Sequence, residues 1–398
     1  MTKTDQSSPL FAEPADRLPA VAYVLTFCIA VIGSNSLVLG PIAPEVARTL
    51  GSSVALVMSA SAAFGLGTAA SALLMARHVD RLGARRMLLW ALLGLAAALG
   101  LSALSPAVPA LAGAQLMAGV ASGIALPAIY ASAAAVAPPG RESRTIGLVL
   151  TGWTLSMVAG VSLSAVVADY VHWRAVYAVV AMLALIASLT LKVSRYRDVP
   201  ATGPAPQPLA ALRIVGVKPL LIACAAFMSA FYGIYGYLGD HLHSGLGEPV
   251  SANGIVALVY GIGFGAAALL DGIVDRLGSR RVMPFAFLAV AAVYLGFALA
   301  GGSFVAVLGL TFLWGLTNHF GLNVLIMRLA AIDPSRRGTI MGLNSAVTYL
   351  AVFAGTTGFG PLYATWGFAF ASATALCLML IAAAAGSWRS RDRVGLPG

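Results

Sequence analysis

The chain is built from long apolar segments that are separated by short polar connections. A helix that crosses a bilayer needs about 20 mostly apolar residues. Twelve segments of this kind lie at residues 20–40, 53–75, 87–105, 107–131, 145–168, 173–191, 218–239, 252–271, 282–300, 303–327, 339–358 and 367–386. Because long unbroken runs dominate over short alternating ones, the pattern predicts membrane-spanning helices and excludes an outer-membrane barrel.

The composition agrees with this pattern. Of the 398 residues, 60% are hydrophobic and 10% are charged, and the mean hydropathy is +0.90. A soluble globular chain is ~45–50% apolar and ~25% charged. These values exclude a soluble enzyme, a disordered chain and a disulfide scaffold. Cys28, Cys224 and Cys377 each lie in an apolar run and form no metal-binding spacing, so we expect them to pack as small apolar residues.

The basic residues predict the orientation of the helices. If the N-terminus is cytosolic, 22 of the 24 Lys and Arg residues fall on the cytosolic side, and only Arg48 and Arg174 fall on the other. Such a bias is the positive-inside signal, and an even number of spans then places both termini in the cytosol. The net charge of +10 therefore reflects topology and contact with anionic membrane lipid, and no nucleic-acid partner is expected.

The chain is predicted to consist of two similar halves. Residues 79–86 match residues 274–281 at seven of eight positions, and the same offset of 195 aligns Gly147 with Gly342. A Pro-rich basic segment falls between the sixth and seventh spans. The predicted boundaries are a cytosolic tail at 1–19, a six-helix half at 20–191, a cytosolic linker at 192–217, a second six-helix half at 218–386 and a cytosolic tail at 387–398. Two parallel six-helix repeats are a recurring plan of membrane transporters.

The repeated segment resembles the loop motif G-x-x-x-D-R-x-G-R-R of the major facilitator superfamily. The matching residues are Asp80, Arg81, Gly83, Arg85 and Arg86 in the first copy, and Asp275, Arg276, Gly278, Arg280 and Arg281 in the second. The resemblance implies an all-α membrane protein with twelve transmembrane helices in two pseudo-symmetric six-helix bundles. It also implies that these ten residues form a gating motif. Each Asp would dock on an opposing helix end, where a carboxylate is favoured, and the glycines would allow a tight turn.

Within the superfamily, the chain looks most similar to twelve-span drug/proton antiporters and arabinose-efflux-like permeases. Residues 40–45, 173–174 and 337–339 carry this likeness. Two features depart from it. Gln115 stands where many antiporters have an Arg, and residues 160–164 lack the proline of the span-five motif G-P-x-x-G-G. These departures concern the proton chemistry and not the fold.

Ionisable residues in the middle of a span are costly and usually mark function. No Asp, Glu, Lys or Arg lies near the middle of any predicted span, and His319 is the one titratable group well inside one. An imidazole has an ordinary pKa of about 6.5, which suits proton exchange near neutral pH. We therefore expect His319 to take part in proton coupling, together with Asp240 at the end of span seven. The alternative is a neutral His319 that is hydrogen-bonded to a neighbouring helix.

Other polar and aromatic residues fall in spans that line the central cavity of the family. The candidates for substrate binding are Asn35, Trp153, Tyr232, Tyr235, Asn318, Asn323, Asn344 and Tyr349. A cavity lined by these side chains without a central acid suits a neutral or mildly polar solute. A strong dication would require a carboxylate partner.

The predicted function is secondary active transport of small organic compounds by alternating access, as proton-linked efflux. An importer or facilitator of a small metabolite with the same fold is the alternative. The chain lacks a phosphate-binding G-x-x-x-x-G-K-[ST] loop, so we expect neither an ATPase nor any other enzyme, and no cofactor or metal. The expected partners are the small-molecule substrate, protons and membrane lipid. The protein is expected to act as a monomer that spans a bacterial inner membrane many times.

Overall fold

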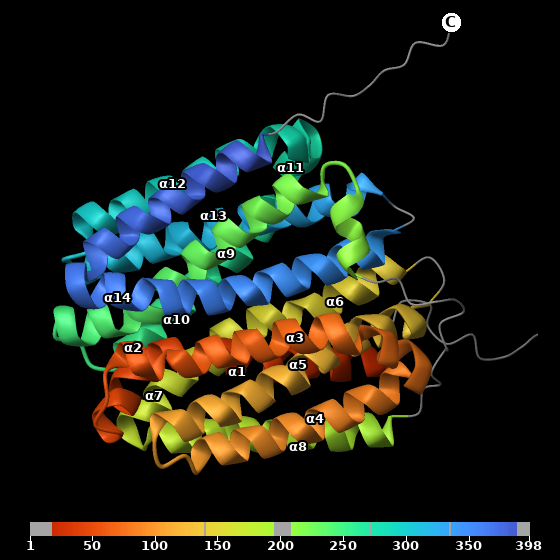
Figure 1. The fold of residues 1–398 in the computed structure, drawn as a ribbon, viewed down its shortest axis with the longest axis horizontal. Helices are drawn as coiled ribbons and strands as arrows, with labels where there is room; N and C mark the ends of the chain where they lie inside the picture. The colour runs from red at the N-terminus through yellow and green to blue at the C-terminus, as the bar shows by residue number, and fades with distance from the viewer. Residues whose placement is uncertain (1–17, 139–140, 195–207, 271, 334–335, 388–398) are drawn as a thin grey trace, which may run out of the picture.

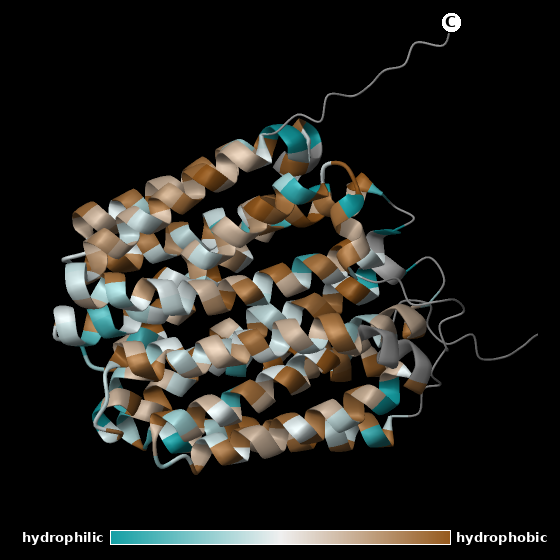
Figure 2. Ribbon diagram, viewed as in Figure 1, coloured by the Kyte–Doolittle hydropathy of each residue, from teal (hydrophilic) through white to brown (hydrophobic). Residues whose placement is uncertain are grey.

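The computed structural model describes residues 18–138, 141–194, 208–270, 272–333 and 336–387. Within these ranges, the side chains of residues 76–81, 142–143, 273, 275 and 337 are not described. The described residues form helices joined by short turns. The long helices run side by side, and hydrophilic residues gather at the ends of the bundle (Figures 1 and 2).

The first half of the chain forms the lower part of the bundle in Figure 1. Its elements are α1 (Ala20–Thr49), α2 (Val54–Val57), α3 (Ser59–Leu82), α4 (Ala84–Ala103), α5 (Val108–Val136), α6 (Glu142–Leu155), the π-helix η1 (Ser156–Val161), α7 (Ser162–Tyr170) and α8 (Trp173–Val193). The π-helix joins α6 to α7 within a single apolar stretch. π-Helical segments of this kind are rare and occur often at functional sites.

The second half forms the upper part of the bundle. Its elements are the 3-10 helix η2 (Pro208–Arg213), α9 (Val217–Asp240), the π-helix η3 (His241–Gly245), α10 (Ala252–Ala267), the 3-10 helix η4 (Ala268–Leu270), α11 (Gly272–Leu277), α12 (Ser279–Ala300), α13 (Phe304–Ile332) and α14 (Arg337–Gly386). The predicted linker is therefore partly helical, because η2 lies inside it.

Eleven helical stretches in the described part of the chain are long and apolar enough to cross a membrane. The sequence pattern predicts twelve spans, and the difference lies in α14, which contains both 339–358 and 367–386. This helix of 50 residues is broken at Gly367, whose φ of 77° and ψ of −178° are not helical. A positive φ is readily adopted by glycine and rarely by other residues, so Gly367 permits the change of direction between the two helical parts.

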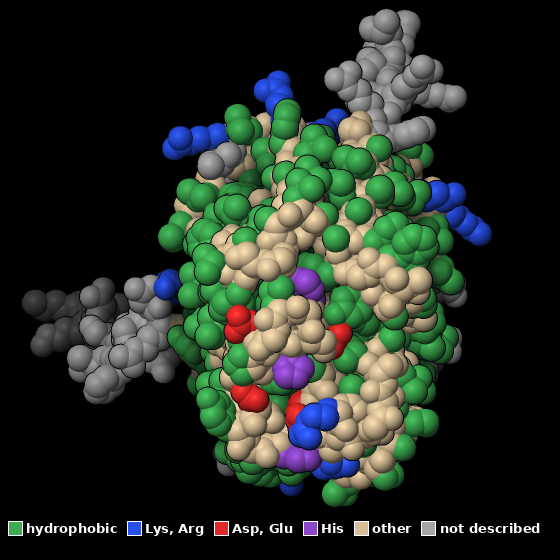
Figure 3. Space-filling view, turned by 90° about the vertical axis from the view of Figure 1, so that its left-hand side faces the viewer, with side chains coloured by type: hydrophobic (Ala, Val, Ile, Leu, Met, Phe, Trp, Pro, Cys, Tyr) green, Lys and Arg blue, Asp and Glu red, His purple; other side chains and the backbone are tan. Residues whose placement is uncertain are grey.

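The two ends of the bundle differ in charge. The arginine-rich turns between α3 and α4 and between α11 and α12 lie at one end, which we call the basic end; it is on the right in Figure 1. The opposite end, which we call the acidic end, carries Glu45, Asp169, Asp240 and Glu248. Acidic and histidine side chains gather there in Figure 3.

Arg48 and Arg174, the two basic residues predicted on the non-cytosolic side, lie at the acidic end and have local partners. Arg48 forms a two-point ion pair with Glu45, with N–O distances of 2.7 and 2.9 Å. Arg174 donates to the backbone oxygen of Ser105 at 3.0 Å, and its guanidinium lies 4.4 Å from the centre of the Trp173 ring. Both arginines are thus held at this end by contacts within the first half.

The repeated loops have the same backbone in both halves. Gly83 precedes α4 with φ 89° and ψ 134°, and Gly278 precedes α12 with φ 81° and ψ 137°. A side chain at either position would be strained because of the positive φ. The internal repeat in the sequence therefore corresponds to a repeated turn in the structure.

Glycines allow neighbouring helices to approach closely in both halves. Between α3 and α5, a Cβ added at Gly119 would lie 2.1 Å from the Phe64 oxygen. Between α10 and α13, a Cβ at Gly315 would lie 2.2 Å from the Tyr260 oxygen. Membrane helices commonly associate through small residues that bring their backbones together. These two helix pairs thus have equivalent contacts in the two halves.

We predict that Gly119→Ala destabilises the protein, because the new methyl group would push α5 away from α3. Overpacking of this kind costs about 1–3 kcal/mol, and a lower thermal midpoint of the purified protein in detergent would show it. Gly113→Ala on the same helix is the control, because nothing lies within 4 Å of a Cβ there. If Gly119→Ala melts at the same temperature as the control, close approach at Gly119 does not stabilise the fold.

Candidate functional site between the two halves

Five aromatic side chains from α9, α10 and α13 form a connected group, which we call the aromatic cluster. Phe231 is central to it: its ring centre lies 5.5 Å from that of Tyr235 in a stacked arrangement, 5.0 Å from Tyr232, 5.8 Å from Tyr260 and 5.2 Å from Trp314. Phe231 is only partly buried, whereas the other four are buried. The cluster therefore places a partly exposed phenyl ring among four buried aromatic rings inside the second half.

Polar groups at the rim of the aromatic cluster are hydrogen-bonded. The Asn318 Nδ2 atom donates to the Tyr260 hydroxyl at 3.1 Å, and the Trp314 Nε1 atom donates to the Tyr294 hydroxyl at 3.1 Å. The Asn318 Oδ1 atom is buried without a hydrogen-bond partner in the described structure. An unmatched buried acceptor is unusual and calls for a water or ligand partner.

A second polar group lies within the first half. The side-chain amides of Asn35 and Gln115 bond to each other at 3.2 and 3.3 Å, and Gln115 also donates to the Ser102 hydroxyl at 3.0 Å. This network joins α1, α5 and α4. Gln115, noted in the sequence for departing from the family pattern, is thus the direct partner of the predicted substrate residue Asn35.

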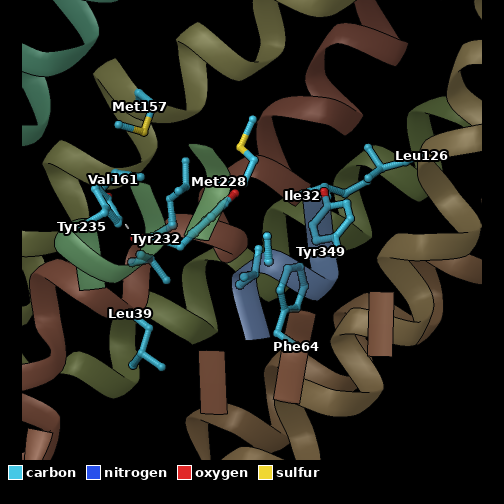
Figure 4. Packing of buried hydrophobic residues seen from close by; sticks show 14 of the residues in the cluster. Ile32, Leu39, Phe64, Leu126, Met157, Val161, Met228, Tyr232, Tyr235 and Tyr349 are labelled. Carbon is cyan, nitrogen blue, oxygen red and sulfur yellow. Dashed lines mark hydrogen bonds between the residues drawn. The ribbon is translucent and has the colours of Figure 1, made fainter. Parts of the chain in front are cut away.

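The remaining predicted substrate residues lie on α6, α13 and α14. Trp153 on α6 donates to the Tyr130 hydroxyl at 3.5 Å. Asn344 and Tyr349 lie on α14 and are buried, and the Asn344 Oδ1 atom has no hydrogen-bond partner in the described structure. Asn323 on α13 is partly buried. Figure 4 shows Tyr232 and Tyr349 among Ile32, Met228 and other apolar side chains of both halves.

The two predicted proton-coupling residues lie in separate places. His319 is partly buried on α13, and its ring is edge-on to Phe264 with the ring centres 4.9 Å apart. Asp240 lies at the acidic end, where its two oxygens accept from the Ser244 hydroxyl and the Tyr363 hydroxyl, each at 2.7 Å. The Asp240 carboxylate is therefore held by two neutral hydroxyl groups.

Backbone oxygens of α1 are bound directly by the second half. A proline at position 41 has no N–H group, so the Leu37 oxygen lacks its usual helical partner. The Tyr235 hydroxyl donates to this oxygen at 3.0 Å, and Asn253 Nδ2 donates to the Pro41 oxygen at 2.7 Å. The helix backbones also approach closely, because a Cβ at Gly239 would lie 2.8 Å from the Gly40 oxygen. We call this set of interactions, which includes Asn253 at the start of α10, the α1–α9 contact.

A small cavity lies beside the α1–α9 contact. Pro41, Tyr235, Asn253, Tyr260, Thr311 and Trp314 are among its lining residues, and its volume is about 20 Å³. This is room for roughly one water molecule. The Asn253 Oδ1 and Thr311 Oγ1 atoms are both buried there without partners in the described structure. The cavity can hold a bridging water but is too small for an organic solute.

Further contacts between the halves lie from the middle of the spans toward the acidic end. A Cβ at Gly65 on α3 would lie 2.8 Å from the Tyr349 oxygen on α14, and a Cβ at Gly254 on α10 would lie 2.5 Å from the Ser162 oxygen on α7. The Ser251 N–H donates to Asp169 Oδ2 at 3.1 Å. The π-helix η1 faces this interface, because a Cβ at Gly261 would lie 2.7 Å from Val158 Cγ2.

The predicted gating residues lie at the basic end. Arg85 donates to the backbone oxygens of Lys192 and Ser194 at 3.0 and 3.1 Å, so it binds the C-terminal end of α8, where a cation is favoured. Arg86, Arg276, Arg280 and Arg281 are exposed. The side chains of Asp80, Arg81 and Asp275 lie outside the described residues, so the proposed docking of the two Asp residues remains a prediction.

Sequence reasoning missed several residues of this site. Phe231 precedes Tyr235 by four residues and therefore shares its helix face, which is a signal that could have identified it. Tyr260 and Trp314 are aromatic residues inside spans, and Asn253 opens span eight. Their significance depends on which helices are neighbours, and the spacing of residues within one helix does not reveal this.

Comparison with known proteins identifies the fold. The family model of the Major Facilitator Superfamily matches residues 25–356. A bacterial homologue of the human lysosomal transporter Spinster, solved in an inward-facing and unoccupied conformation, superposes with a TM-score of 0.74 at 15% identity. The superposition covers 92% of this chain and 95% of that chain.

Two relatives have informative names. A chloramphenicol resistance protein of Streptomyces lividans is 27% identical over 371 residues, which cover 87% of this chain and 93% of that protein. A probable sugar efflux transporter of Pasteurella multocida (strain Pm70) is 26% identical over 227 residues, which cover 55% of each chain.

We predict that Tyr235→Phe loosens the α1–α9 contact, because the Leu37 oxygen would be left buried without a partner. Such a loss costs about 1–3 kcal/mol, which corresponds to roughly a fivefold or greater rise in the opening equilibrium. A water-soluble thiol reagent should label a Leu39→Cys reporter faster in the purified Tyr235→Phe variant.

Tyr237→Phe is the matched control for this measurement. The Tyr237 hydroxyl donates to the Thr356 oxygen at 2.7 Å, and both residues belong to the second half. The control should not change labelling at Leu39→Cys. Equal labelling rates in both variants would show that the Tyr235 hydroxyl does not hold the halves together.

Proposed function

The chain belongs to the Major Facilitator Superfamily, and on this basis we propose that it exports a neutral or mildly polar small organic compound by alternating access. Members of the family are transporters and not enzymes. The protein is thus a multi-pass inner-membrane transporter, consistent with the apolar helices of the described chain. The substrate class, the direction and the coupling ion are the parts that we propose.

We propose twelve spans with both termini in the cytosol. The break at Gly367 supports a division of α14 into the two predicted spans, which gives an even number. The positive-inside rule then assigns the basic end to the cytosol. The acidic end, with the α1–α9 contact, would face the outside.

The proposed substrate class rests on one observation, which is that the buried polar side chains are uncharged. In the part of the chain whose side chains are described, the buried polar residues are all Ser, Thr, Asn or Gln. A charged substrate inside the bilayer would require an opposite charge nearby, because an unpaired ion is costly there. The aromatic cluster and Asn318 provide a ring surface beside an amide, which suits a neutral compound with an apolar body and few polar groups.

The contacts between the halves support alternating access. Tyr235, Gly239 and Asn253 join the halves near the acidic end. We propose that this arrangement closes the transporter on the outside, and that the α1–α9 contact breaks when the site opens outward. The repeated loops at Gly83 and Gly278 would provide the alternative closure on the cytosolic side, through Asp80 and Asp275.

Export is supported by the names of the two relatives, one a chloramphenicol resistance protein and one a probable sugar efflux transporter. Both names also refer to uncharged compounds. Import or facilitated diffusion is the alternative outcome of the transport test. It is favoured by Gln115, which replaces the Arg of many antiporters and is bonded to Asn35 and Ser102.

We predict that everted membrane vesicles containing the protein accumulate a substrate identified by a thermal-shift screen, with chloramphenicol and neutral sugars as first probes. Phe231→Ala should raise the KM by about two- to tenfold, since an aromatic contact contributes about 0.5–1.5 kcal/mol. Phe285→Ala is the control, because this ring is 73% exposed on the lipid-facing side of α12. Accumulation of the substrate in intact cells and not in everted vesicles would contradict export.

We predict that His319→Gln abolishes the response of transport to a pH gradient and leaves substrate binding largely intact. Glutamine keeps a hydrogen-bonding side chain but cannot titrate. Asp240→Asn should slow the cycle or shift its pH optimum. The measurement is pH-jump-driven transport in proteoliposomes, and His243→Gln at the acidic end is the control. If His319→Gln and Asp240→Asn both respond like the parent, neither residue carries the coupling proton.

A further inference from the structure

A groove at the basic end lies where the polypeptide enters the second half. It is formed by η2 and the first turns of α9, and its volume is about 620 Å³. Its lining includes Arg213, Val215, Gly216, Lys218, Pro219 and Ile222. We propose that this groove binds the headgroup of an anionic phospholipid. The groove is separate from the aromatic cluster, and lipid binding there does not depend on the direction of transport.

The groove is held in place by the bundle. Ala211 in η2 is fully buried. Pro208 borders α14, because a Cβ at Gly342 would lie 3.8 Å from its ring. Gly216 turns the chain into α9 with a φ of 90°, and a Cβ at this position would lie 3.9 Å from Ile332 at the end of α13. The walls of the groove are therefore packed against the ends of two other helices.

The charge of the groove suits a phosphate group. Arg213 and Lys218 are both exposed, and neither forms an ion pair in the described structure. No side chain caps the N-terminal end of the 24-residue helix α9. The helix dipole makes such an end favourable for an anion. The Val217 N–H already donates to the Ile214 oxygen at 3.2 Å and Pro219 has no N–H, so the dipole and the two cations provide the attraction. Two cations and an uncapped helix end thus converge on one groove.

The apolar residues around the groove indicate that the phosphate belongs to a lipid. Val215 is 81% exposed, Ile222 is 54% exposed and Leu209 in η2 is 60% exposed. The membrane-spanning stretch begins at Val217, so these side chains lie at the boundary between headgroups and hydrocarbon. Acyl chains would cover the apolar side chains while the phosphate meets Arg213 and Lys218. A soluble phosphate would leave the apolar side chains uncovered.

The test compares lipid binding of four purified full-length proteins. They are the parent, Arg213→Gln, Lys218→Gln and the double variant, in detergent micelles containing phosphatidylglycerol or phosphatidylcholine. Native mass spectrometry counts retained lipid, and the thermal midpoint measures its effect. Each basic group near the membrane surface strengthens anionic lipid binding by about fivefold. We therefore expect phosphatidylglycerol binding to fall about fivefold in each single variant and by roughly 25-fold in the double variant.

A charge-matched control separates the groove from the general charge of this end. Lys192→Gln combined with Arg281→Gln removes two exposed charges from the basic end outside the groove. We expect this control to keep parental phosphatidylglycerol binding. Equal losses in the control and the groove variant would overturn the site, because binding would then depend on net charge alone.

The final arm distinguishes a lipid from a free phosphate. Inorganic phosphate at millimolar concentration should not raise the thermal midpoint in phosphatidylcholine micelles, whereas phosphatidylglycerol should. If inorganic phosphate gives the same shift and the double variant abolishes it, the groove is a soluble-anion site and the lipid proposal is wrong. Equal binding of phosphatidylcholine and phosphatidylglycerol by the parent would also overturn it.

Discussion

Close approach of helix backbones at glycines is the constraint on which the rest of this structure depends. In a bilayer, the surrounding lipid is as apolar as the helix surfaces, so packing and hydrogen bonds have to hold the helices together. Gly119 against Phe64 and Gly315 against Tyr260 provide this packing inside each half. Gly239 against Gly40 provides it between the halves. The first two contacts stabilise each half as a unit, whereas the third lies where the two units meet.

The polar interactions of the interior rely almost entirely on neutral groups. Asn35 bonds to Gln115, Asn318 to Tyr260 and Tyr235 to a backbone oxygen. Neutral pairs avoid the cost of burying ions in a medium of low dielectric constant. Contacts of this kind also respond little to salt, which acts mainly on exposed charges. Charge is instead placed at the two ends of the bundle, where it defines orientation.

The sequence pattern predicts the general architecture well because the forces behind it are local or repetitive. Apolar length defines the spans, and the offset of 195 finds the paired turns at Gly83 and Gly278. The break at Gly367 within one long helix and the π-helix η1 depend on helix geometry that hydropathy does not record. The hydrogen-bond partners of individual side chains are even harder to predict from the sequence. Nothing near Tyr235 in the sequence points to Leu37, which lies 198 residues away.

The Tyr235 hydroxyl in the α1–α9 contact binds a main-chain oxygen, and this affects how the hydrogen bond can change during evolution. Replacement of the Leu37 side chain leaves that oxygen in place, so residue 37 is free to drift under selection for packing alone. The availability of the oxygen depends on the proline four positions later, at Pro41. Sequence variation that alters this hydrogen bond would therefore be concentrated at Pro41 and Tyr235. In a mutational scan, substitutions of Tyr235 and Pro41 would affect this hydrogen bond, whereas substitutions of Leu37 would leave its acceptor oxygen in place.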